Sequence, residues 1–266
     1  MKREFFSIEE MTSEDIRTLQ LKCLDILLYF QKICEKNHLT FYLAGGTAIG
    51  ALRHKGFIPW DDDIDVFMPR PDYEKLTKIW NSEADTSRYI FCRSTDKINY
   101  HHHAASIMDI TTTWIEQRNV DADIPQGIVM DIIPLDGCPD LKVQRFFQLF
   151  YAFIFALFNP QRLPENKNKL IYQTTKILLG IVGNKKLRDF LWMFAEKKMK
   201  KYEFYSYKNI TELIGNINGM LTKHPLDDFL TVVYKEFEGY SMPLMKGYDA
   251  YLKSIFGDYM KMLPPK

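Results

Sequence analysis

The sequence predicts an α/β fold of the α+β kind, in which a mixed β-sheet is flanked by helices and carries a helical appendage. Short apolar runs that end at glycine or proline predict the strands, and segments whose apolar residues recur every three or four positions predict the helices. After residue 140, long segments whose apolar residues recur at helical spacing predict the appendage. Hydrophobic residues make up 46% of the 266 positions, which excludes global disorder.

The first expected element is a long helix that ends near Asn37. Thr12 or Ser13 can cap its N-terminus, and Glu14 and Asp15 then lie in the first turn, where the helix dipole favours negative charge. Shorter helices are expected over Thr47–Arg53 and Asp72–Trp80, and strands over Phe41–Gly45, Ile64–Met68, Tyr89–Arg93, Ala104–Met108, Thr112–Glu116 and Gly127–Ile133.

Prolines mark the expected ends of two apolar strands. Because proline lacks the backbone N–H that a sheet uses, Pro69 and Pro134 are expected to end the strands that precede them. The chain then divides into a core of residues 1–140, a mainly helical appendage of residues 141–236 and a C-terminal segment of residues 237–266. We expect the last segment to pack back on the core, so that all three parts form one structural unit.

The overall charge argues against one broad class of partner. The 35 Lys and Arg nearly balance the 34 Asp and Glu, which leaves a formal net charge of +1. A general nucleic-acid binder needs a strong basic excess, so no nucleic-acid partner is expected. The four cysteines have no CxxC spacing and the first residues lack a long apolar run, so we expect a cytoplasmic protein.

The basic residues are concentrated in the middle of the chain. Residues 142–208 hold 14 Lys and Arg against 4 Asp and Glu, a net charge of +10. The same segment holds the run Phe146–Phe158, which is shorter than the ~20 residues that cross a bilayer. This run is either a buried core helix or an interfacial helix with basic residues near anionic headgroups. The second interpretation gives residues 141–208 a peripheral contact with the inner face of the cell membrane.

Two carboxylates lie on one face of an expected strand. Because side chains alternate along a strand, Asp63 and Asp65 point to the same side, and carboxylates about 7 Å apart there repel each other unless a cation lies between them. A third carboxylate, Asp131, interrupts an apolar strand and is costly there unless it is paired or bound to a metal. Oxygen ligands favour Mg²⁺ or Mn²⁺ over zinc. The alternative is a solvated acidic turn.

A glycine pair precedes these carboxylates. Gly45, Gly46 and Thr47 follow a strand and open a helix, and at such a turn backbone N–H groups can approach a phosphate. Many strand-to-helix turns need glycine for geometry alone, so this signal is weak by itself. A strand, a glycine turn, a strand with two aspartates and a third acidic strand, in that order, form the pattern of the nucleotidyltransferase superfold.

Three longer blocks resemble one family within that superfold. The stretch LAGGTAIGALRHKGFIPWDDDIDVFMPRPDY at 43–73 closely resembles the signature of the LicD family. GIVMDIIPLDG at 127–137 resembles its second block, and residues 237–260 resemble its C-terminal block. Family members often carry a lysine just before the next conserved element. This chain has no lysine there, since residues 105–109 are ASIMD. The resemblance covers most of the chain apart from the helical middle.

The resemblance implies both a fold and an activity. LicD proteins resemble nucleotidyltransferases in fold but act as phospho-alcohol transferases. Bacterial members take phosphocholine from CDP-choline, release CMP and modify a sugar of teichoic acid or lipopolysaccharide, whereas fukutin-type relatives transfer ribitol phosphate from CDP-ribitol. A CDP-alcohol donor and a glycan or lipid-linked glycan acceptor are therefore expected here.

The resemblance also assigns roles to particular residues. Asp63 and Asp65 match the metal-binding pair, Asp131 matches the third acidic position, and the turn at 45–47 matches the phosphate-facing turn.

The segment that precedes the aspartates also matches the family. Arg53, His54 and Lys55 match its RHKG element, and we interpret Arg53 or Lys55 as neutralising diphosphate charge. The alternative is that these residues only cover the loop before Pro59. Asp61 either coordinates the metal through a water molecule or stabilises the turn, and we favour the second role.

The expected mechanism is metal-assisted phosphoryl transfer. Mg²⁺ held by Asp63 and Asp65 would bridge the diphosphate while an acceptor hydroxyl attacks the phosphorus that bears the alcohol. Asp131 would either complete a second metal site or take the hydroxyl proton. Two alternatives stay open: nucleotidylyl transfer from an NTP to a small molecule or an RNA end, and an inactive member that serves as a scaffold or glycan-binding module.

Overall fold

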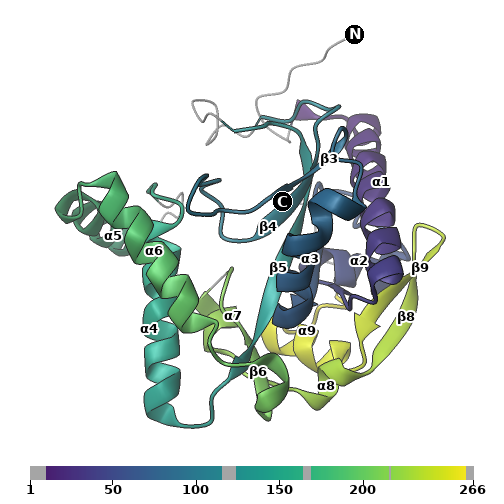
Figure 1. Ribbon diagram of the computed structural model, residues 1–266. Helices are drawn as coiled ribbons and strands as arrows, with labels where there is room; N and C mark the ends of the chain where they lie inside the picture. Colours follow the sequence, from purple (N-terminus) through teal and green to yellow (C-terminus); the bar gives the residue numbers. More distant parts are fainter. Residues whose placement is uncertain (1–9, 116–123, 164–168, 216, 262–266) are drawn as a thin grey trace.

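A computed structural model describes residues 10–115, 124–163, 169–215 and 217–261 of the chain (Figure 1). Its centre is a seven-stranded mixed sheet, and a two-stranded hairpin lies beside it. The strands are β1 Tyr42–Leu43, β2 Asp65–Pro69, β3 Tyr89–Cys92, β4 Ala105–Asp109, β5 Ile128–Cys138, β6 Asn209–Glu212 and β7 His224–Pro225 in the sheet, and β8 Val232–Phe237 and β9 Tyr240–Met245 in the hairpin.

The strand order places β5 at the middle of the sheet. The order is β1-β2-β5-β4-β3, with β6 pairing the far half of β5 and β7 pairing β6. Strands β2 and β5 are parallel to each other, and the other pairs are antiparallel. The expected mixed sheet flanked by helices is therefore confirmed.

Helices cover the sheet and extend from it. In Figure 1, α1 and α3 lie on one side of β5, and α4, α5 and α6 project on the other. The helices are α1 Ser13–Asn37, α2 Gly45–His54, α3 Arg70–Glu83, α4 Lys142–Phe158, α5 Lys169–Ile181, α6 Lys185–Met199, α7 Ile217–Leu221, α8 Asp227–Leu230 and α9 Tyr248–Phe256, with a 3₁₀ turn at Phe204–Ser206.

The long first helix begins and ends where the sequence predicts. Thr12 is its N-cap and forms a capping box with Asp15: the Asp15 N–H donates to the Thr12 hydroxyl at 3.2 Å, and the Thr12 N–H donates to the Asp15 carboxylate at 3.1 Å. His38 closes the other end in the left-handed region, with φ at 54°. The buried side of α1 packs into the main core beside β4 and β5.

Proline 134 does not end its strand, contrary to the sequence prediction. Because the Asp131 N–H donates at 2.9 Å to the carbonyl of Ile64, the residue just before β2, alternation turns the nitrogen of Pro134 to the opposite edge of β5. On that edge β4 pairs up to Ile132 and β6 pairs from Leu135 onwards. The missing N–H therefore falls in the gap between two partner strands, where no ladder bond is lost.

Two further expectations differ from the structure. The strand expected over residues 112–116 is wrong for Thr112–Ile115, because Thr111 and Thr112 fold back in a turn onto Asp109: the Thr111 N–H donates to its carboxylate at 2.9 Å. Glu116 lies outside the described residues. The segment 141–236, expected to be mainly helical, contains helices α4 to α8 among its described residues, but after Met199 it also supplies β6 and β7 to the main sheet and most of β8 to the hairpin.

The apolar side chains form two cores. The larger core lies around the sheet, α1, α3 and α9, and the smaller one is built on Phe155, Trp192 and Met199 of α4 and α6. At the C-terminal end of the described chain, Tyr251 of α9 packs edge-on against Phe67 of β2, with ring centroids 5.4 Å apart. Within the described residues, no helix is long and apolar enough to cross a membrane.

Candidate active site

Neighbouring parallel strands bring two of the expected carboxylates together. Asp65 opens β2, Asp131 lies in β5, and the two are register partners. Adjacent strands lie about 4.8 Å apart, and paired side chains point to the same face. The structure therefore places Asp131 beside Asp65, as the sequence reasoning required.

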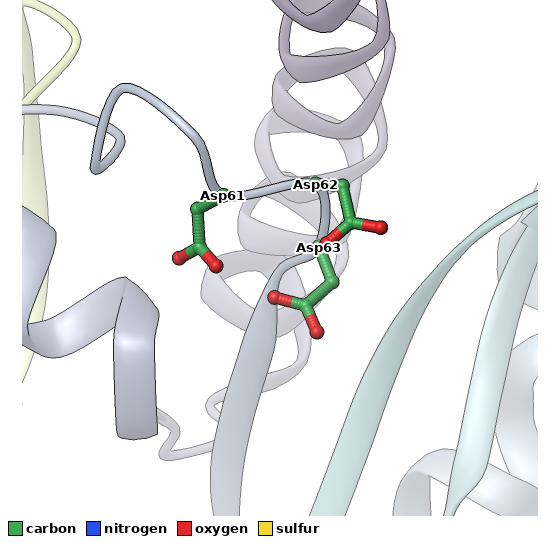
Figure 2. Close-up of side chains that lie close together, drawn as sticks. All are labelled: Asp61, Asp62 and Asp63. Carbon is green, nitrogen blue, oxygen red and sulfur yellow. The ribbon is translucent and has the colours of Figure 1, made fainter. Parts of the chain in front are cut away.

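A run of three aspartates leads into the same strand. Figure 2 shows Asp61, Asp62 and Asp63 on the loop before β2, and each offers a carboxylate oxygen within 4.8 Å of those of the other two. The backbone of Asp61 is fixed, since its N–H donates to Ile58 and its carbonyl accepts from Gln20, both at 2.9 Å. The backbone hydrogen bonds of Asp61 thus fix the turn, and its side chain is one of the three clustered carboxylates.

Burial, and then mutual repulsion, raises the pKa values of these carboxylates. Burial raises the pKa of Asp61 to about 7, and the charges of Asp63 and Asp62 add to it. Desolvation and the charges of Asp62 and Asp131 raise the pKa of Asp63 to about 6, although this side chain reaches solvent. Burial, and then the charges of Asp131 and Asp63, hold the pKa of Asp65 well above its usual range. These carboxylates are therefore harder to deprotonate in the folded chain than in water.

These residues fit a hard divalent cation. The donor set consists of carboxylate oxygens, which Mg²⁺ and Mn²⁺ prefer. The mutual repulsion described above is the cost that a bound cation would remove. Asp63 and Asp65 of the predicted ligand set, together with Asp61, are the side chains that would hold it. Asp131, the third predicted ligand, lies outside the cluster at 61–63 and accepts a hydrogen bond from Ser106, so a metal role for Asp131 stays a prediction.

The N-terminus of α2 faces the same carboxylates. Ala44 provides no side-chain cap, so the first N–H groups of α2 are available to an anion. Gly45 has φ of +48°, and a Cβ added there would lie 3.6 Å from Asp65 Oδ2. A Cβ at Gly46 would lie only 2.8 Å from Asp61 Oδ2. The glycine pair thus lets the helix start pack directly against the acidic group.

Thr47 has a different role from the one its position suggests. Its side chain is buried, and its hydroxyl accepts a hydrogen bond from the Asp65 N–H at 3.0 Å. This bond joins the first turn of α2 to the start of β2. Thr47 therefore fixes the glycine turn relative to Asp65, and what it can offer to a phosphate is its backbone N–H.

The segment Arg53–Lys55 is not brought to the carboxylates. Eight residues separate Gly45 from Arg53 on α2, about 12 Å along the helix axis. The Arg53 guanidinium donates to the Tyr259 carbonyl at 3.4 Å, and exposed Lys55 pairs with Glu236 at 3.2 Å. His54 Nε2 is buried without a hydrogen-bond partner. In this conformation the three residues line the far end of α2, and a role in neutralising diphosphate stays a prediction.

A small pocket of about 60 Å³ that opens to solvent adjoins Asp131. The Asp131 carboxylate is held on both oxygens: the Ser106 hydroxyl donates to Oδ1 at 2.6 Å, and His102 Nε2 lies 3.5 Å from Oδ2. Ser106 is in the ASIMD segment, where the sequence departs from its family's pattern. The pocket wall includes aromatic, basic and thioether side chains, among them Tyr100, His101, His102, Met108, Trp114 and Arg162.

Two of three consecutive histidines, His101 and His102, line this pocket, and His103 follows His102 in the chain. His101 Nδ1 lies 3.0 Å from the Pro160 carbonyl, and His103 Nε2 lies 3.1 Å from the Ala156 carbonyl. Both carbonyls belong to the C-terminal end of α4 and the residues that follow it. The outer two histidines thus fasten the segment to α4, and the middle one faces Asp131.

Glu212 was missed by the sequence reasoning. It is 5% exposed, and burial raises its pKa to about 7. Its charge is one of those that raise the pKa of Asp65, and Tyr251 donates to it at 3.5 Å. No motif surrounds Glu212 in the sequence, and only the pairing of β6 with β5 brings it near the site.

Comparisons with known proteins point to one family. The family model for the LicD/FKTN/FKRP nucleotidyltransferase domain matches residues 38–124, which include the glycine turn and the aspartate run. The chain is 32% identical over 264 residues to lipopolysaccharide cholinephosphotransferase LicD of Haemophilus influenzae, an alignment that covers 94% of this chain and 93% of that protein.

Two more distant relatives match shorter segments. Human ribitol 5-phosphate transferase FKRP is 22% identical over 126 residues, which is 40% of this chain and 25% of that protein. Mannosyltransferase regulator 4 of Saccharomyces cerevisiae is 24% identical over 136 residues, which is 50% of this chain and 11% of that protein.

Proposed function

The chain belongs to the LicD family of phosphotransferases, and from this premise we propose that it transfers phosphocholine from CDP-choline to a hydroxyl of a cell-surface glycan precursor and releases CMP. The acceptor class covers teichoic acid, lipopolysaccharide and capsule precursors. The observation that carries the proposal is the juxtaposition of the uncapped start of α2 with the carboxylates of Asp61 and Asp65, to which Asp63 is adjacent. The similarity to a cholinephosphotransferase over nearly the whole chain supports choline as the donor alcohol.

The reaction is one displacement at phosphorus. The acceptor oxygen forms a bond to the phosphorus that carries choline, and the bond from this phosphorus to the bridging oxygen of the diphosphate breaks. CMP leaves with that oxygen, and the hydroxyl proton passes to a base. Mg²⁺ or Mn²⁺ held by Asp61, Asp63 and Asp65 would supply positive charge to the diphosphate.

The start of α2 positions the diphosphate. Its free N–H groups, together with the positive end of the helix dipole, favour an anion at this point. Gly45 and Gly46 let the phosphate approach the backbone, and the hydrogen bond from Asp65 to Thr47 keeps the turn in place. This geometry orients the reacting phosphorus before the acceptor arrives.

Asp131 is the proposed proton acceptor. Its carboxylate lines the pocket that adjoins the metal-holding group, and it is not part of the tight cluster at 61–63. The Ser106 hydroxyl and His102 fix its orientation from two sides. A base must lie within hydrogen-bond reach of the proton that it removes, and the pocket gives an acceptor hydroxyl that access.

The proposed compartment is the cytoplasm. Cys23, Cys34, Cys92 and Cys138 are all free and buried, which is the usual state of cysteines in a reducing environment.

One assay tests the proposed function and its competitor together. The purified chain is incubated with Mg²⁺ and, separately, with CDP-choline, CDP-ribitol, CDP-glycerol and CTP, and the release of CMP and of pyrophosphate is measured. We expect CMP from CDP-choline, because donor hydrolysis does not require the glycan acceptor. Pyrophosphate from CTP without CMP from any CDP-alcohol would instead identify a nucleotidylyl transferase.

A further inference from the structure

Helix α4 is apolar on its outward side as well as on its inward side, where Phe155 and Phe158 are buried in the smaller core. Its inward side also carries buried Arg145 and Gln148: the Arg145 guanidinium donates to Gln148 at 2.7 Å and to Thr211 at 3.0 Å. Its outward side carries exposed apolar residues at helical spacing; the side chain of Phe146, for example, is 65% exposed. The other exposed residues on this side are Val143, Phe147, Phe150 and Phe153.

The exposed aromatic surface continues onto α6. The ring of Phe150 contacts Tyr151 at 5.5 Å between centroids, Tyr151 contacts Phe194 at 5.9 Å, and Phe194 stacks on Phe190 at 6.0 Å. We call the exposed apolar residues of α4 and α6 the aromatic face: Val143, Phe146, Phe147, Phe150, Phe153, Leu187, Phe190 and Phe194. An exposed apolar surface of this extent marks an interaction site rather than a solvated one.

Lysines border the aromatic face. The ammonium group of Lys198 lies 5.2 Å from the centre of the Phe194 ring. The acidic residues of α6 are engaged elsewhere, since Glu196 pairs with Arg93 at 2.7 Å and Asp189 accepts from Gln161 at 2.5 Å. The exposed lysines on the appendage helices and just beyond α6 are Lys142, Lys176, Lys185, Lys186, Lys197 and Lys201.

We propose that the aromatic face docks on an anionic lipid bilayer. Apolar side chains would enter the boundary between headgroups and acyl chains, and the bordering lysines would lie among anionic headgroups. The +10 charge of residues 142–208 is complementary to such a surface. None of the described helices could cross the bilayer, so the contact is peripheral.

The same charges argue against a second copy of the chain as the occupant. A two-fold interface places the same patch on both sides, so the lysines of one copy would face those of the other. Like charges juxtaposed in an interface oppose association, whereas anionic lipid neutralises them. A self-associating chain is therefore an outcome that the experiment must separate from lipid binding.

The docking surface is connected to the active-site pocket. Carbonyls of Ala156 and Pro160, at and after the end of α4, hold His103 and His101, and the pocket wall includes His101 and His102. Docking through α4 would therefore bring the pocket close to the bilayer. This last step rests on the proposed function: an acceptor glycan that is carried on a lipid would reach Asp131 from the membrane side.

The test is co-sedimentation with vesicles of phosphatidylcholine alone and of an equal mixture with phosphatidylglycerol. The full chain should bind the mixed vesicles and bind phosphatidylcholine weakly, and high salt should release it, because salt screens the lysine contribution. The double variants Phe146→Ser/Phe150→Ser and Lys185→Glu/Lys186→Glu should each bind roughly tenfold or more weakly. CDP-choline hydrolysis in lipid-free solution should be unchanged in both, which separates failure of docking from failure of the proposed function.

Matched controls lie outside the aromatic face. Tyr234→Ser on β8 removes an aromatic ring that is 62% exposed, and Lys32→Glu reverses an exposed charge on α1. Both should bind vesicles like the original chain. Equal vesicle binding by the Phe146→Ser/Phe150→Ser variant, or a stable lipid-free dimer that this variant converts to monomer, would overturn the proposal.

Discussion

Asp65 of β2 and Asp131 of β5 are register partners on adjacent parallel strands. The Asp131 N–H donates to Ile64, the residue just before Asp65, and the Asp65 N–H donates to Thr47 in the first turn of α2. One short network of backbone bonds thus ties together the two carboxylates and the glycine turn. The charge of Asp131 is, after burial, the largest contribution to the raised pKa of Asp65.

Replacing Asp65 by Asn should separate stability from activity. Asn keeps the shape of the side chain but removes a charge that the metal-free fold accommodates poorly. With EDTA at neutral pH, we expect the melting temperature of Asp65→Asn to equal or exceed that of the original chain, while CMP release with Mg²⁺ falls roughly 100-fold or more.

The control for this variant is Asp96→Asn, at an exposed aspartate in a loop. It should change neither the melting temperature nor the rate. A strong loss of stability in Asp65→Asn without EDTA dependence would show that Asp65 is a structural residue.

A bound cation should change how the stability of the chain depends on pH. Because the folded chain raises the pKa of Asp61 to about 7 and that of Asp63 to about 6, it binds more protons than the unfolded chain between about pH 4 and about pH 7. The free energy of unfolding contributed by these groups is therefore present at low pH and is lost as the pH rises through this window.

Differential scanning fluorimetry with Mg²⁺ and with EDTA checks this expectation. The difference in melting temperature between the two conditions should grow from about pH 5 to about pH 8, since a cation binds the deprotonated carboxylates. Taking the difference cancels groups outside the site, such as His224, whose pKa burial lowers to about 4. A difference that stays constant across the range would contradict the cation site.

Adding one methyl group at Gly46 should displace the carboxylate of Asp61. The new Cβ would lie 2.8 Å from Asp61 Oδ2, so the carboxylate must move away. We expect Gly46→Ala to weaken Mn²⁺ binding, measured by titration calorimetry, and to lower CMP release about tenfold. Gly180→Ala on α5, where a Cβ meets nothing within 4 Å, should leave both quantities unchanged.

Lys55 provides a test between two interpretations. The family resemblance suggests that it neutralises the diphosphate, but the structure pairs it with Glu236 at the far end of α2. If this conformation is the one that binds the donor, Lys55→Ala should leave the KM for CDP-choline unchanged, and exposed ion pairs of this kind contribute little to stability. A large increase in KM would show instead that the segment at 53–55 moves toward the donor.

Much of the fold of residues 10–115 was predictable because its determinants are local, as with the N-cap of α1, which follows from residue types at adjacent positions. The expectation that Asp63 and Asp65 share one strand face was wrong, because β2 begins at Asp65 and Asp63 lies in the loop before it (Figure 2). The placement of Asp131 beside Asp65 depends on the pairing of β5 with β2, which strand alternation alone does not determine.

The position of Glu212 depends on long-range pairing of β6 with β5, for which no short motif exists. The sequence also could not decide whether Phe146 and its neighbours are exposed, because the same apolar run is compatible with a core helix and with an interfacial helix.

The most direct test of the account is CMP release from CDP-choline by the purified chain in the presence of Mg²⁺, of EDTA, and of Mg²⁺ with Asp131→Asn. The account predicts release with Mg²⁺, none with EDTA, and a strong reduction in the variant at unchanged melting temperature. Equal release in all three conditions would contradict it.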